Sequence, residues 1–581
     1  MSIRSRVSRR GWLVFFLIVG LVVVWGVLAG RELVLAAGDA RSGQDRLDRV
    51  QAELGATDLI RGAGLEDVAA ARAEFARAHD HARSWWVTPL RWLPVVGRQV
   101  RSVDALTGAA AGVTEVSADA MEAAQEVLET ADTRGPGRVA LVERLGVIAD
   151  RASRALADID VGPDDALVAP LADARDELAA DLDDVRAGFA DVGAATDGLA
   201  PLLAGPARYL VFAANNAEMR AGSGMFLSVG VLEFDDGSFS LSEMTPTGDL
   251  TLPPGAVAVT GDFAARWGWT DPSQEWRNLA MTPRFNASAS LARRMWEWRT
   301  GEEVDGVLAL DPIALRSILA ATGPVDVDGE VVSADTVVDD VLFEQYLDLL
   351  GEDFEQAARR ERLGTIARAT VAALDAGDWD TATLLEELRV VADGRHVLAW
   401  SPGPVQQQGW RGMGISGRLA DDSVLLAVMN RGGNKLDQFL GVSARIDVDP
   451  GDDRSDVTVR VTITNDTPAG LPRYLAGPFP GRDYPAGTYV GLFSLDVPGA
   501  ARDVTIDDGV PLVAAGSDGP ARVVATDLSL TPGATRELVV RFSLPGESGS
   551  LAVEPTARVP GVEWSDGEAA WVDGSTHTVR W

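Results

Sequence analysis

The stretch RYLVFAANNAEMRAGSGMFLSVGVLEFDDGSFSLSEMTPTGD, residues 208–249, decides the fold of this chain. Residues 209–213 and 225–234 are apolar runs, and the longer run predicts a sheet strand buried on both faces. Residues 215–224 between them are predicted to be a polar loop with Arg220 near its centre. Asp235-Asp236-Gly237 predicts a hairpin turn, and residues 238–244 alternate like a half-exposed strand. A charged loop held between two strands is a favoured place for a binding site.

Composition limits the possible partners. With 581 residues the chain has room for several domains. A net charge of -34 is too acidic for a protein that binds a phosphate backbone, so nucleic acid is not an expected partner. The absence of cysteine removes disulfides, thiolate catalysis and cysteine-bound metals. His79 and His81 point to different faces of a predicted helix and are predicted to be ordinary surface residues, so no metal site is expected.

An uncharged run, GWLVFFLIVGLVVVWGVLAG at residues 11–30, is long enough to cross a bilayer as a helix. Arginines without acidic residues precede it, so the positive-inside rule places residues 1–10 in the cytoplasm and everything after Arg31 outside. We therefore expect a single-pass protein of the cell membrane, with its anchor in residues 11–37 and an extracytoplasmic body. A signal peptide cleaved near residues 34–37 is the alternative, but the apolar run exceeds the usual signal core.

Residues 38–200 are predicted to form an extracytoplasmic helical bundle or stalk. Apolar residues recur every three or four positions, and proline and glycine breaks divide the region into several amphipathic helices. Trp85, Trp86 and Trp92 surround one of these breaks. They either lie at a membrane interface, where amphipathic rings are favoured, or fill the turn of a helical hairpin. The packing interpretation is favoured, because indoles more often fill cores.

Residues 205–395 are predicted to form an α/β or α+β domain with helices covering a central sheet. After the opening hairpin, helices are expected over residues 288–299 and 313–322, with a buried strand over residues 304–310 between them. Asp311 and Pro312 start the second helix, so an N-cap role for Asp311 is favoured over metal binding. Two further helices are predicted over residues 333–350 and 354–374.

Residues 396–581 are predicted to form an antiparallel β-sandwich, because short strands alternate with turns rich in glycine, aspartate and proline. The run NRGGNKLDQF, residues 430–439, lies at the join with the α/β domain. Its two glycines and polar side chains indicate a tight backbone path. Lys435 is the only lysine of the chain, which suggests a compact ammonium in a confined hydrogen-bonded site; a structural turn is the alternative.

The runs YLVFAANNAEMRAGSGMFLSVGVLEFDDG, GEEVDGVLALDPIALRSILAATGPVDV and NRGGNKLDQF resemble the bacterial membrane proteins grouped as domain-of-unknown-function family 4012. That resemblance implies no activity. The order of strands, arginine loop, hairpin and late helix more distantly resembles the LytR-CpsA-Psr family, which attaches lipid-linked glycopolymers to the cell wall by phosphotransfer. This second resemblance implies a sheet like that family's, a pyrophosphate held by Arg220 and Arg359, and Mg²⁺ as cofactor if transfer occurs.

Three departures from the LytR-CpsA-Psr pattern leave catalysis open. Gln356 stands where the first late arginine is expected, Thr247 replaces an arginine-aspartate pair, and the loop after Arg220 lacks an acidic residue. Phosphotransfer depends on such charges to stabilise its transition state. The sequence contains no Ser-His-Asp pattern, phosphate-binding loop or dinucleotide glycine motif. No catalytic residue is therefore assigned.

The candidate ligand-binding residues are polar side chains of these motifs: Arg220, Ser223, Asp249, Arg277, Arg359, Asn430, Asn434, Lys435 and Asp437. We expect them to contact a phosphorylated or lipid-linked envelope glycan, such as a polyprenyl-phosphate-linked glycan or peptidoglycan. In the simpler interpretations, Arg220 holds its loop by bonding carbonyls and Arg359 belongs to a solvated helix face. The alternative function is a non-catalytic envelope scaffold with unknown protein partners.

Overall fold

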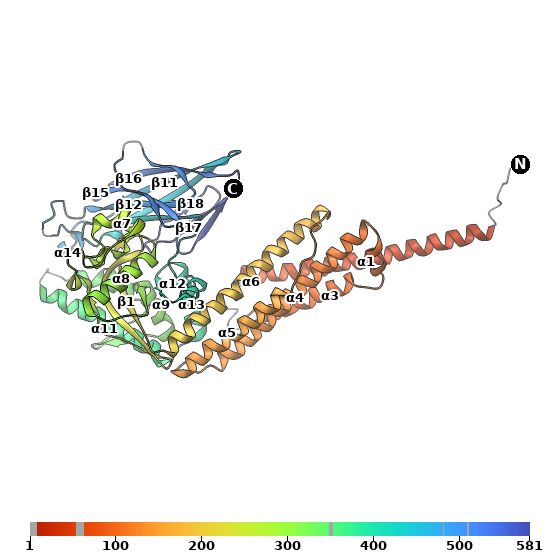
Figure 1. Cartoon of the computed structure of the whole chain (residues 1–581), viewed down its shortest axis with the longest axis horizontal. Helices are drawn as coiled ribbons and strands as arrows, with labels where there is room; N and C mark the ends of the chain where they lie inside the picture. Colours follow the sequence, from red (N-terminus) through yellow and green to blue (C-terminus); the bar gives the residue numbers. More distant parts are fainter. Residues whose placement is uncertain (1–8, 54–62, 348–352, 480, 508–509) are drawn as a thin grey trace. The chain divides into compact units, whose positions relative to one another are not determined.

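The computed structural model describes residues 9–53, 63–347, 353–479, 481–507 and 510–581, excluding the side chains of residues 9–22, 50–53 and 353–360 (Figure 1). The chain divides into two compact units. The first comprises Met1–Ala131 and Arg144–Gly193, and the second comprises Asp132–Glu143 and Ala194–Trp581. The predicted α/β and β-sandwich regions both lie in the second unit.

The first unit consists of long helices, as the periodicity predicts. They are α1 (Arg9–Glu53), α3 (Leu65–Ala82), the 3-10 helix η1 (Thr88–Trp92), α4 (Val96–Glu129) and the larger parts of α5 (Pro136–Ala157) and α6 (Ala169–Ala204). α3 packs against both α1 and α4. Leu106, Leu156 and Leu182 form a small buried core between α4, α5 and α6.

The two helices α1 and α3 run antiparallel. Arg46 of α1 pairs with Glu74 at 3.0 Å, and Glu32 lies 2.7 Å from Nδ1 of His81. The prediction that the two neighbouring histidines are ordinary surface residues is therefore wrong. His81 is held against α1, and His79 lies 3.4 Å from the hydroxyl of Thr107, because α3 is covered by a helix on each side.

The predicted membrane span lies within α1, but the side chains of residues 11–22 are outside the described part. Among the residues that are described, no helix offers a stretch both long and apolar enough to cross a membrane. The membrane anchor therefore stays a prediction.

The tryptophans between α3 and α4 do not fill the turn. Trp85 is 68% exposed and Trp92 is 87% exposed, and only Trp86 is half-buried. The packing interpretation is wrong for the two exposed rings, because the buried Val87 occupies the inside of the turn instead.

The second unit contains the predicted α/β domain around one mixed sheet. Its strand order is β3-β2-β1-β5-β8, with β4 paired to β2. The strands are β1 (Ala207–Arg220), β2 (Ser223–Asp235), β3 (Ser238–Leu241), β4 (Thr245–Pro246), β5 (Gly306–Leu310) and β8 (Val397–Trp400). β1 pairs antiparallel with β2 and parallel with β5. The long strand β2 and the hairpin that follows it are where the sequence predicts them.

Both faces of this sheet are buried, because apolar side chains of β1 alternate between two cores. Phe212 faces a core that includes Met295 of α8. Tyr209 and Val211 face the other core, which includes Leu202 near the end of α6.

The predicted polar loop over residues 215–224 is wrong. β1 continues to Arg220 and β2 begins at Ser223, so only a tight turn separates the strands, with irregular pairing near Asn215. The polar side chains of this run are buried because distant parts of the chain supply their partners: Asn215 bonds Tyr346, and Asn216 bonds Asp311 at 2.8 Å.

Helices and a small hairpin cover the sheet. They are η2 (Thr247–Leu250), α7 (Gly261–Trp267), η3 (Gly268–Thr270), η4 (Trp276–Met281), α8 (Phe285–Thr300), α9 (Pro312–Thr322), β6 (Val325–Val327), β7 (Glu330–Val332), α10 (Val337–Leu342), η5 (Glu344–Tyr346), α11 (Asp353–Ala376), α12 (Thr381–Asp393) and α13 (Pro404–Gly412). The single helix predicted over residues 333–350 is instead α10 followed by η5. The chain breaks at Phe343, whose φ and ψ of -136° and -61° are not helical.

The C-terminal part is a sandwich of two sheets, with strand orders β13-β16-β11-β10-β18-β19 and β14-β15-β12-β9-β17-β20 (Figure 1). Its elements are β9 (Ser423–Asn430), η6 (Asp437–Phe439), β10 (Leu440–Asp449), β11 (Arg454–Asn465), α14 (Arg473–Ala476), β12 (Tyr489–Pro498), β13 (Arg502–Ile506), β14 (Leu512–Asp518), β15 (Ala521–Leu530), β16 (Thr535–Pro545), β17 (Ser550–Glu554), β18 (Glu563–Ser565), β19 (Ala570–Val572) and β20 (His577–Arg580). The predicted antiparallel pairing holds for most strand pairs of the sandwich, but β10 pairs parallel with β18 and β9 pairs parallel with β17.

β9 joins the sandwich to the α/β domain. Every residue of this strand is buried. Leu426 and Val428 face the core between the two sandwich sheets, whereas Leu425 and Met429 face the core shared with the central α/β sheet. The two predicted domains therefore share one continuous apolar core.

A glycine in β5 sets how closely this strand packs. A Cβ added at Gly306 lies 2.2 Å from the ring of Tyr209 and 2.6 Å from the carbonyl of Trp400. We expect Gly306→Ala to destabilise the protein by about 1–3 kcal/mol through overpacking. Gly248→Ala is the control, since nothing lies within 4 Å of the added atom. Denaturant unfolding of both full-length variants checks this, and equal midpoints contradict it.

Candidate functional site

Five of the predicted residues meet where β1 ends beside the sandwich. Arg220 closes β1 and Asn430 closes β9, while Asn434, Lys435 and Asp437 follow in the segment that enters η6. β1 contacts both β9 and η6. All five residues are at most 5% exposed.

The carboxylate of Asp437 is the centre of this buried network. It accepts hydrogen bonds from the backbone N–H of Met219 at 3.2 Å, Nδ2 of Asn430 at 2.9 Å and the Tyr489 hydroxyl at 3.0 Å. Nη1 of Arg558 lies 3.3 Å from the same carboxylate. Burial raises the pKa of Asp437, and Arg558 is the strongest opposing influence. One side chain thus connects β1, β9, β12 and the segment after β17.

The asparagines of the NRGGNKLDQF run hold its backbone. Nδ2 of Asn430 donates to the backbone and side-chain oxygens of Asn434 at 3.0 and 3.1 Å. Nδ2 of Asn434 donates to the carbonyl of Thr488 at 2.9 Å. Gly433 between them has a φ of 73°, a conformation that glycine adopts without strain. These hydrogen bonds hold the run in one fixed turn.

Lys435 sits in a closed site. Its ammonium pairs with the carboxylate of Glu218 from β1, and it lies 4.9 and 5.3 Å from the ring centroids of Tyr346 and Tyr474. Burial alone lowers the pKa of Lys435, but Glu218 and the two tyrosines outweigh it, so the pKa is raised. The two tyrosine rings stack on each other with centroids 5.5 Å apart, and a compact point charge fits beside them.

Arg220 does not reach an open cavity. Its guanidinium donates to the carbonyls of Met219, at 3.0 Å, and of Asn430, and the residue is 5% exposed. Burial lowers the pKa of Arg220 to about 10, against the opposing effect of Glu218, so the side chain stays charged at neutral pH. This is the geometry of the simpler interpretation, in which the arginine holds its own turn by bonding carbonyls.

The other predicted residues lie on four different elements. Ser223 is buried opposite Arg220 across the β1–β2 turn. Asp249 is exposed in η2, and Arg277 is exposed and paired with Glu275. Arg359 lies in α11, and its side chain is outside the described residues.

A second buried cluster surrounds Asp311. The sequence predicted its N-cap role but not its contacts with Asn216 and His396. Asp311 caps α9 as predicted, accepting from the backbone N–H groups of Ile313 and Ala314 at 2.9 and 3.1 Å. It also accepts from Asn216 at 2.8 Å and lies 2.6 Å from Nδ1 of His396. Among the described residues, no group of three or more histidines, aspartates and glutamates could hold a metal ion.

Sequence reasoning missed the partners that make the network complete, namely Glu218, Tyr346, Tyr474, Tyr489 and Arg558. Glu218 carried one usable signal, as an acidic residue in a run flanked by apolar strands. Arg558 carried none, because a lone arginine in a C-terminal loop gives no indication that it reaches Asp437.

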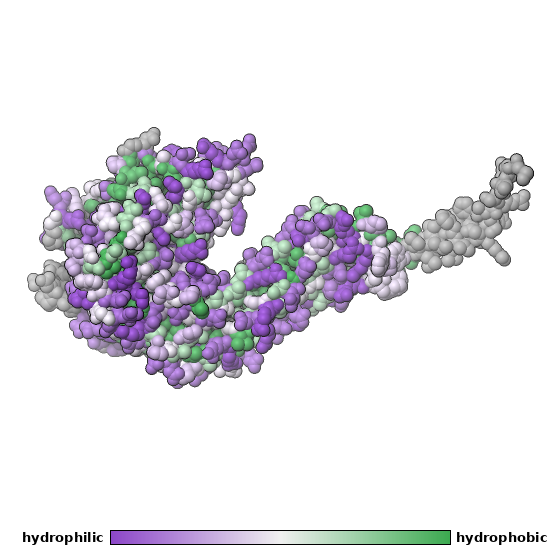
Figure 2. Space-filling model, in the orientation of Figure 1, coloured by the Kyte–Doolittle hydropathy of each residue, from purple (hydrophilic) through white to green (hydrophobic). Residues whose placement is uncertain are grey.

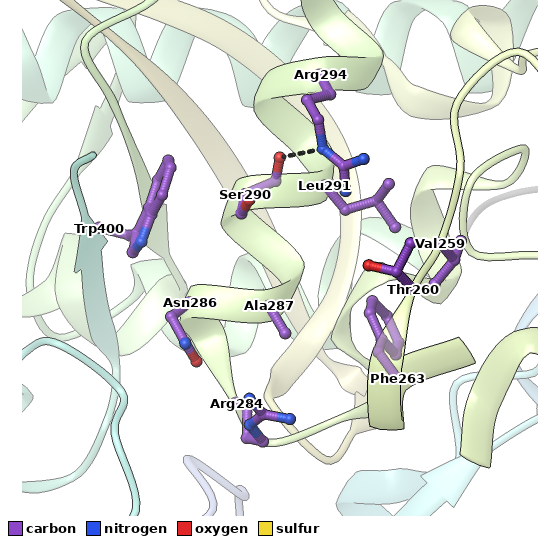
Figure 3. Close-up of a pocket in the computed structure, with 10 residues that line it drawn as sticks. All are labelled: Val259, Thr260, Phe263, Arg284, Asn286, Ala287, Ser290, Leu291, Arg294 and Trp400. Atoms are coloured by element: carbon purple, nitrogen blue, oxygen red, sulfur yellow. Dashed lines mark hydrogen bonds between the residues drawn. The ribbon is translucent and has the colours of Figure 1, made fainter. Parts of the chain in front are cut away.

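An open cavity lies elsewhere, along the first half of α8 (Figure 3). It measures about 350 Å³. Its lining comes from α8, the segment before α7, the start of α7 and the end of β8: Val259, Thr260, Phe263, Arg284, Asn286, Ala287, Ser290, Leu291, Arg294 and Trp400. The sequence placed Arg294 on a helix but assigned it no role.

Two arginines lie at opposite ends of this cavity (Figure 3). Arg294 donates to the carbonyls of Ser290 at 3.3 Å and Ala258 at 2.9 Å, and it has no carboxylate partner within the described part of the chain. Arg284 precedes α8 and pairs with Asp518 at 3.1 Å. The ten lining residues include hydroxyl and amide groups but no carboxylate and no histidine, so the lining can donate hydrogen bonds to an anion.

The partner of Arg284 belongs to a buried acidic pair. Asp518 accepts from Trp267 at 3.2 Å and from Thr282 at 2.9 Å. Asp496 lies nearby on β12, and neither of its carboxyl oxygens has a hydrogen-bond partner among the described residues. Burial raises the pKa of Asp496 well above its usual value. Asp518 adds to the rise, while Arg284 and Arg395 oppose it.

Comparison with known proteins bears out one part of the sequence interpretation. Residues 204–346 match the family model described as Protein of unknown function (DUF4012). The matched segment runs from the end of α6 through β1, β2 and α8 to η5, and so includes nine of the ten residues that line the cavity. No match was found among curated proteins or among solved structures. The resemblance to the LytR-CpsA-Psr family stays a prediction.

The pairing of Lys435 with Glu218 is testable by removing one charge. We expect Lys435→Met to cost about 3–5 kcal/mol of unfolding free energy, because the buried carboxylate of Glu218 loses the ammonium that pairs with it. Adding Glu218→Gln should recover most of that loss. Arg445→Met, which breaks an exposed pair with Asp447 at 2.8 Å, should cost under about 1 kcal/mol. Chemical unfolding of the full chain measures all three, and a double variant as unstable as the single one contradicts the assignment.

Asp496 gives the folded protein a pH dependence with a defined sign. Its raised pKa means that its contribution to stability is complete below about pH 4, the unfolded pKa, and is lost as pH rises toward the folded pKa. Asp496→Asn cannot ionise, so its melting temperature relative to wild type should rise as pH is raised above about 4. Asp527→Asn, at an exposed position on β15, is the control. A constant difference across this pH range contradicts the prediction.

Proposed function

We propose that the protein is a single-pass, membrane-anchored, extracytoplasmic protein of the bacterial cell envelope, and that it binds an anionic glycan in the cavity on α8. The glycan is phosphorylated or lipid-linked, as the sequence suggests. The observation that carries this proposal is Arg294, which lines an open cavity without a carboxylate partner among the described residues.

The dimensions and lining of the cavity support a ligand of about the size of one or two sugar rings. Its volume of about 350 Å³ lies within the range of small-molecule sites, and such sites combine apolar walls with a few placed polar groups. Trp400 and Phe263 supply apolar surface, while Arg284 and Arg294 supply charge at the two ends. Arginine is the side chain best suited to bidentate recognition of phosphate or carboxylate.

Binding is better supported than transfer. General acid–base chemistry needs a group that can exchange a proton near neutral pH, and the cavity lining offers neither a carboxylate nor a histidine. The arginine that the LytR-CpsA-Psr resemblance assigns to pyrophosphate, Arg220, is bonded to carbonyls in the interior. The proposed class of ligand therefore rests on that resemblance. The proposed binding site rests instead on the cavity along α8.

The alternative function is a non-catalytic scaffold. One observation favours it: the predicted site residues of the NRGGNKLDQF run form a closed network that already satisfies most of its own polar groups. In that case the cavity on α8 is incidental, and the same experiment separates the two functions.

The cavity is tested by titrating the full chain in detergent with glucose 1-phosphate and with glucose, using calorimetry. Arg294→Gln should weaken the binding of glucose 1-phosphate by about tenfold or more, because a charge-assisted hydrogen bond contributes about 1.5–3 kcal/mol. Binding of glucose should change little.

The matched control is Arg299→Gln, which removes an exposed arginine from the last turn of the same helix. It should bind the phosphorylated sugar as wild type does. Wild-type protein that does not bind the probe, or an Arg294→Gln variant with unchanged affinity, contradicts the proposal and leaves the scaffold function.

A further inference from the structure

The turn between α3 and α4 exposes a dense apolar surface. Trp85, Trp92, Leu93, Val95 and Val96 are 68, 87, 45, 75 and 44% exposed. We call this set the tryptophan turn. Figure 2 shows hydrophobic residues on the surface at that end of the helical unit. Apolar patches of this kind on a soluble surface mark contacts with a protein or a membrane.

The charge around the tryptophan turn differs from that of the rest of the chain. Residues 84–103 contain arginines at positions 91, 98 and 101 and no acidic residue, in a protein of net charge -34. Arg91 pairs with Asp104 at 3.0 Å, just beyond this run. Aromatic rings combined with basic side chains are the composition of segments that lie at lipid headgroups.

The packing of α1 against α3 places the tryptophan turn along the predicted anchor. Because the helices are antiparallel, higher residue numbers in α3 lie beside lower ones in α1. Arg77 lies 3.6 Å from Asp39, and His81 lies 2.7 Å from Glu32. The chain that follows His81 therefore lies level with the residues of α1 before Glu32, where the predicted span ends (Figure 1).

We propose that the tryptophan turn inserts into the outer headgroup layer of the same bilayer that α1 crosses. This inference rests on the proposed membrane anchor, but not on the cavity of α8. Trp85 and Trp92 place amphipathic rings at the interface, and the neighbouring arginines contact anionic headgroups. The turn thereby gives the helical unit a second membrane contact beside the span.

A bilayer suits this surface better than a protein partner does. The exposed side chains come from one short segment beside the predicted exit point of the span, so a membrane-crossing α1 brings them to the lipid without any further binding step. Tryptophan favours the membrane–water interface, and each added apolar side chain strengthens that contact.

Because the chain contains no cysteine, one introduced cysteine provides a single site for a thiol-reactive label. Val95→Cys probes the turn, Val23→Cys probes the predicted span, and Val147→Cys, at 55% exposure on α5, is the control in water. Each full-length variant carries a nitrobenzoxadiazole label and is reconstituted in vesicles of equimolar phosphatidylcholine and phosphatidylglycerol. Lipids with brominated acyl chains quench only labels that reach the hydrocarbon boundary.

Quenching of about half or more is expected at positions 23 and 95, with little at 147. Adding Trp85→Ser and Trp92→Ser should reduce the quenching at 95 and leave that at 23 unchanged. Quenching at 23 but not at 95 overturns the inference while the anchor stands. No quenching at 23 contradicts the anchor itself and with it this inference. Neither result bears on the binding of a sugar phosphate in the cavity.

Discussion

The second unit of the protein depends on one buried carboxylate. Asp437 receives hydrogen bonds from a backbone N–H of β1, an asparagine of β9 and a tyrosine of β12, and it pairs with Arg558. A carboxylate taken out of water loses its hydration, and only a full set of donors offsets that cost. Since the donors come from both the central sheet and the sandwich, the two parts cannot separate without exposing or orphaning this group.

That constraint explains why the sequence predicts part of the fold and not the rest. The long strand β2, the Asp-Gly hairpin and the cap of α9 follow from local chemistry, so each is visible in a short window. The polar end of β1 is not. Asn216 and Glu218 look like loop residues because their partners, Asp311 and Lys435, lie far along the chain. Burial of a polar group depends on what meets it, and a window of the sequence does not contain that information.

The same dependence on distant partners distinguishes Arg220, in the buried network, from Arg294, beside the cavity on α8. Arg220 was the prominent candidate from its loop-like surroundings, yet the continuation of β1 carries it inside, where Nη1 of its guanidinium donates to two carbonyls. Arg294 looked like one charge among others on a helix. It lies beside an open cavity because α8 presents that face toward the segment before α7 and the end of β8. A ligand can only bind donors that solvent can reach. The solvent access of an arginine therefore indicates a binding site better than the sequence motif around it does.

The distribution of charge bears on the proposed membrane contact of the helical unit. A chain with a net charge of -34 is repelled by an anionic lipid surface, and at physiological salt this repulsion acts over roughly 8 Å. A segment without acidic residues, carrying arginines and exposed indoles, is the part that can approach the headgroups at low cost. Residues 84–103 are such a segment. Under the proposed membrane contact, the exposure of Trp92, which is unfavourable in water, becomes favourable at the lipid interface.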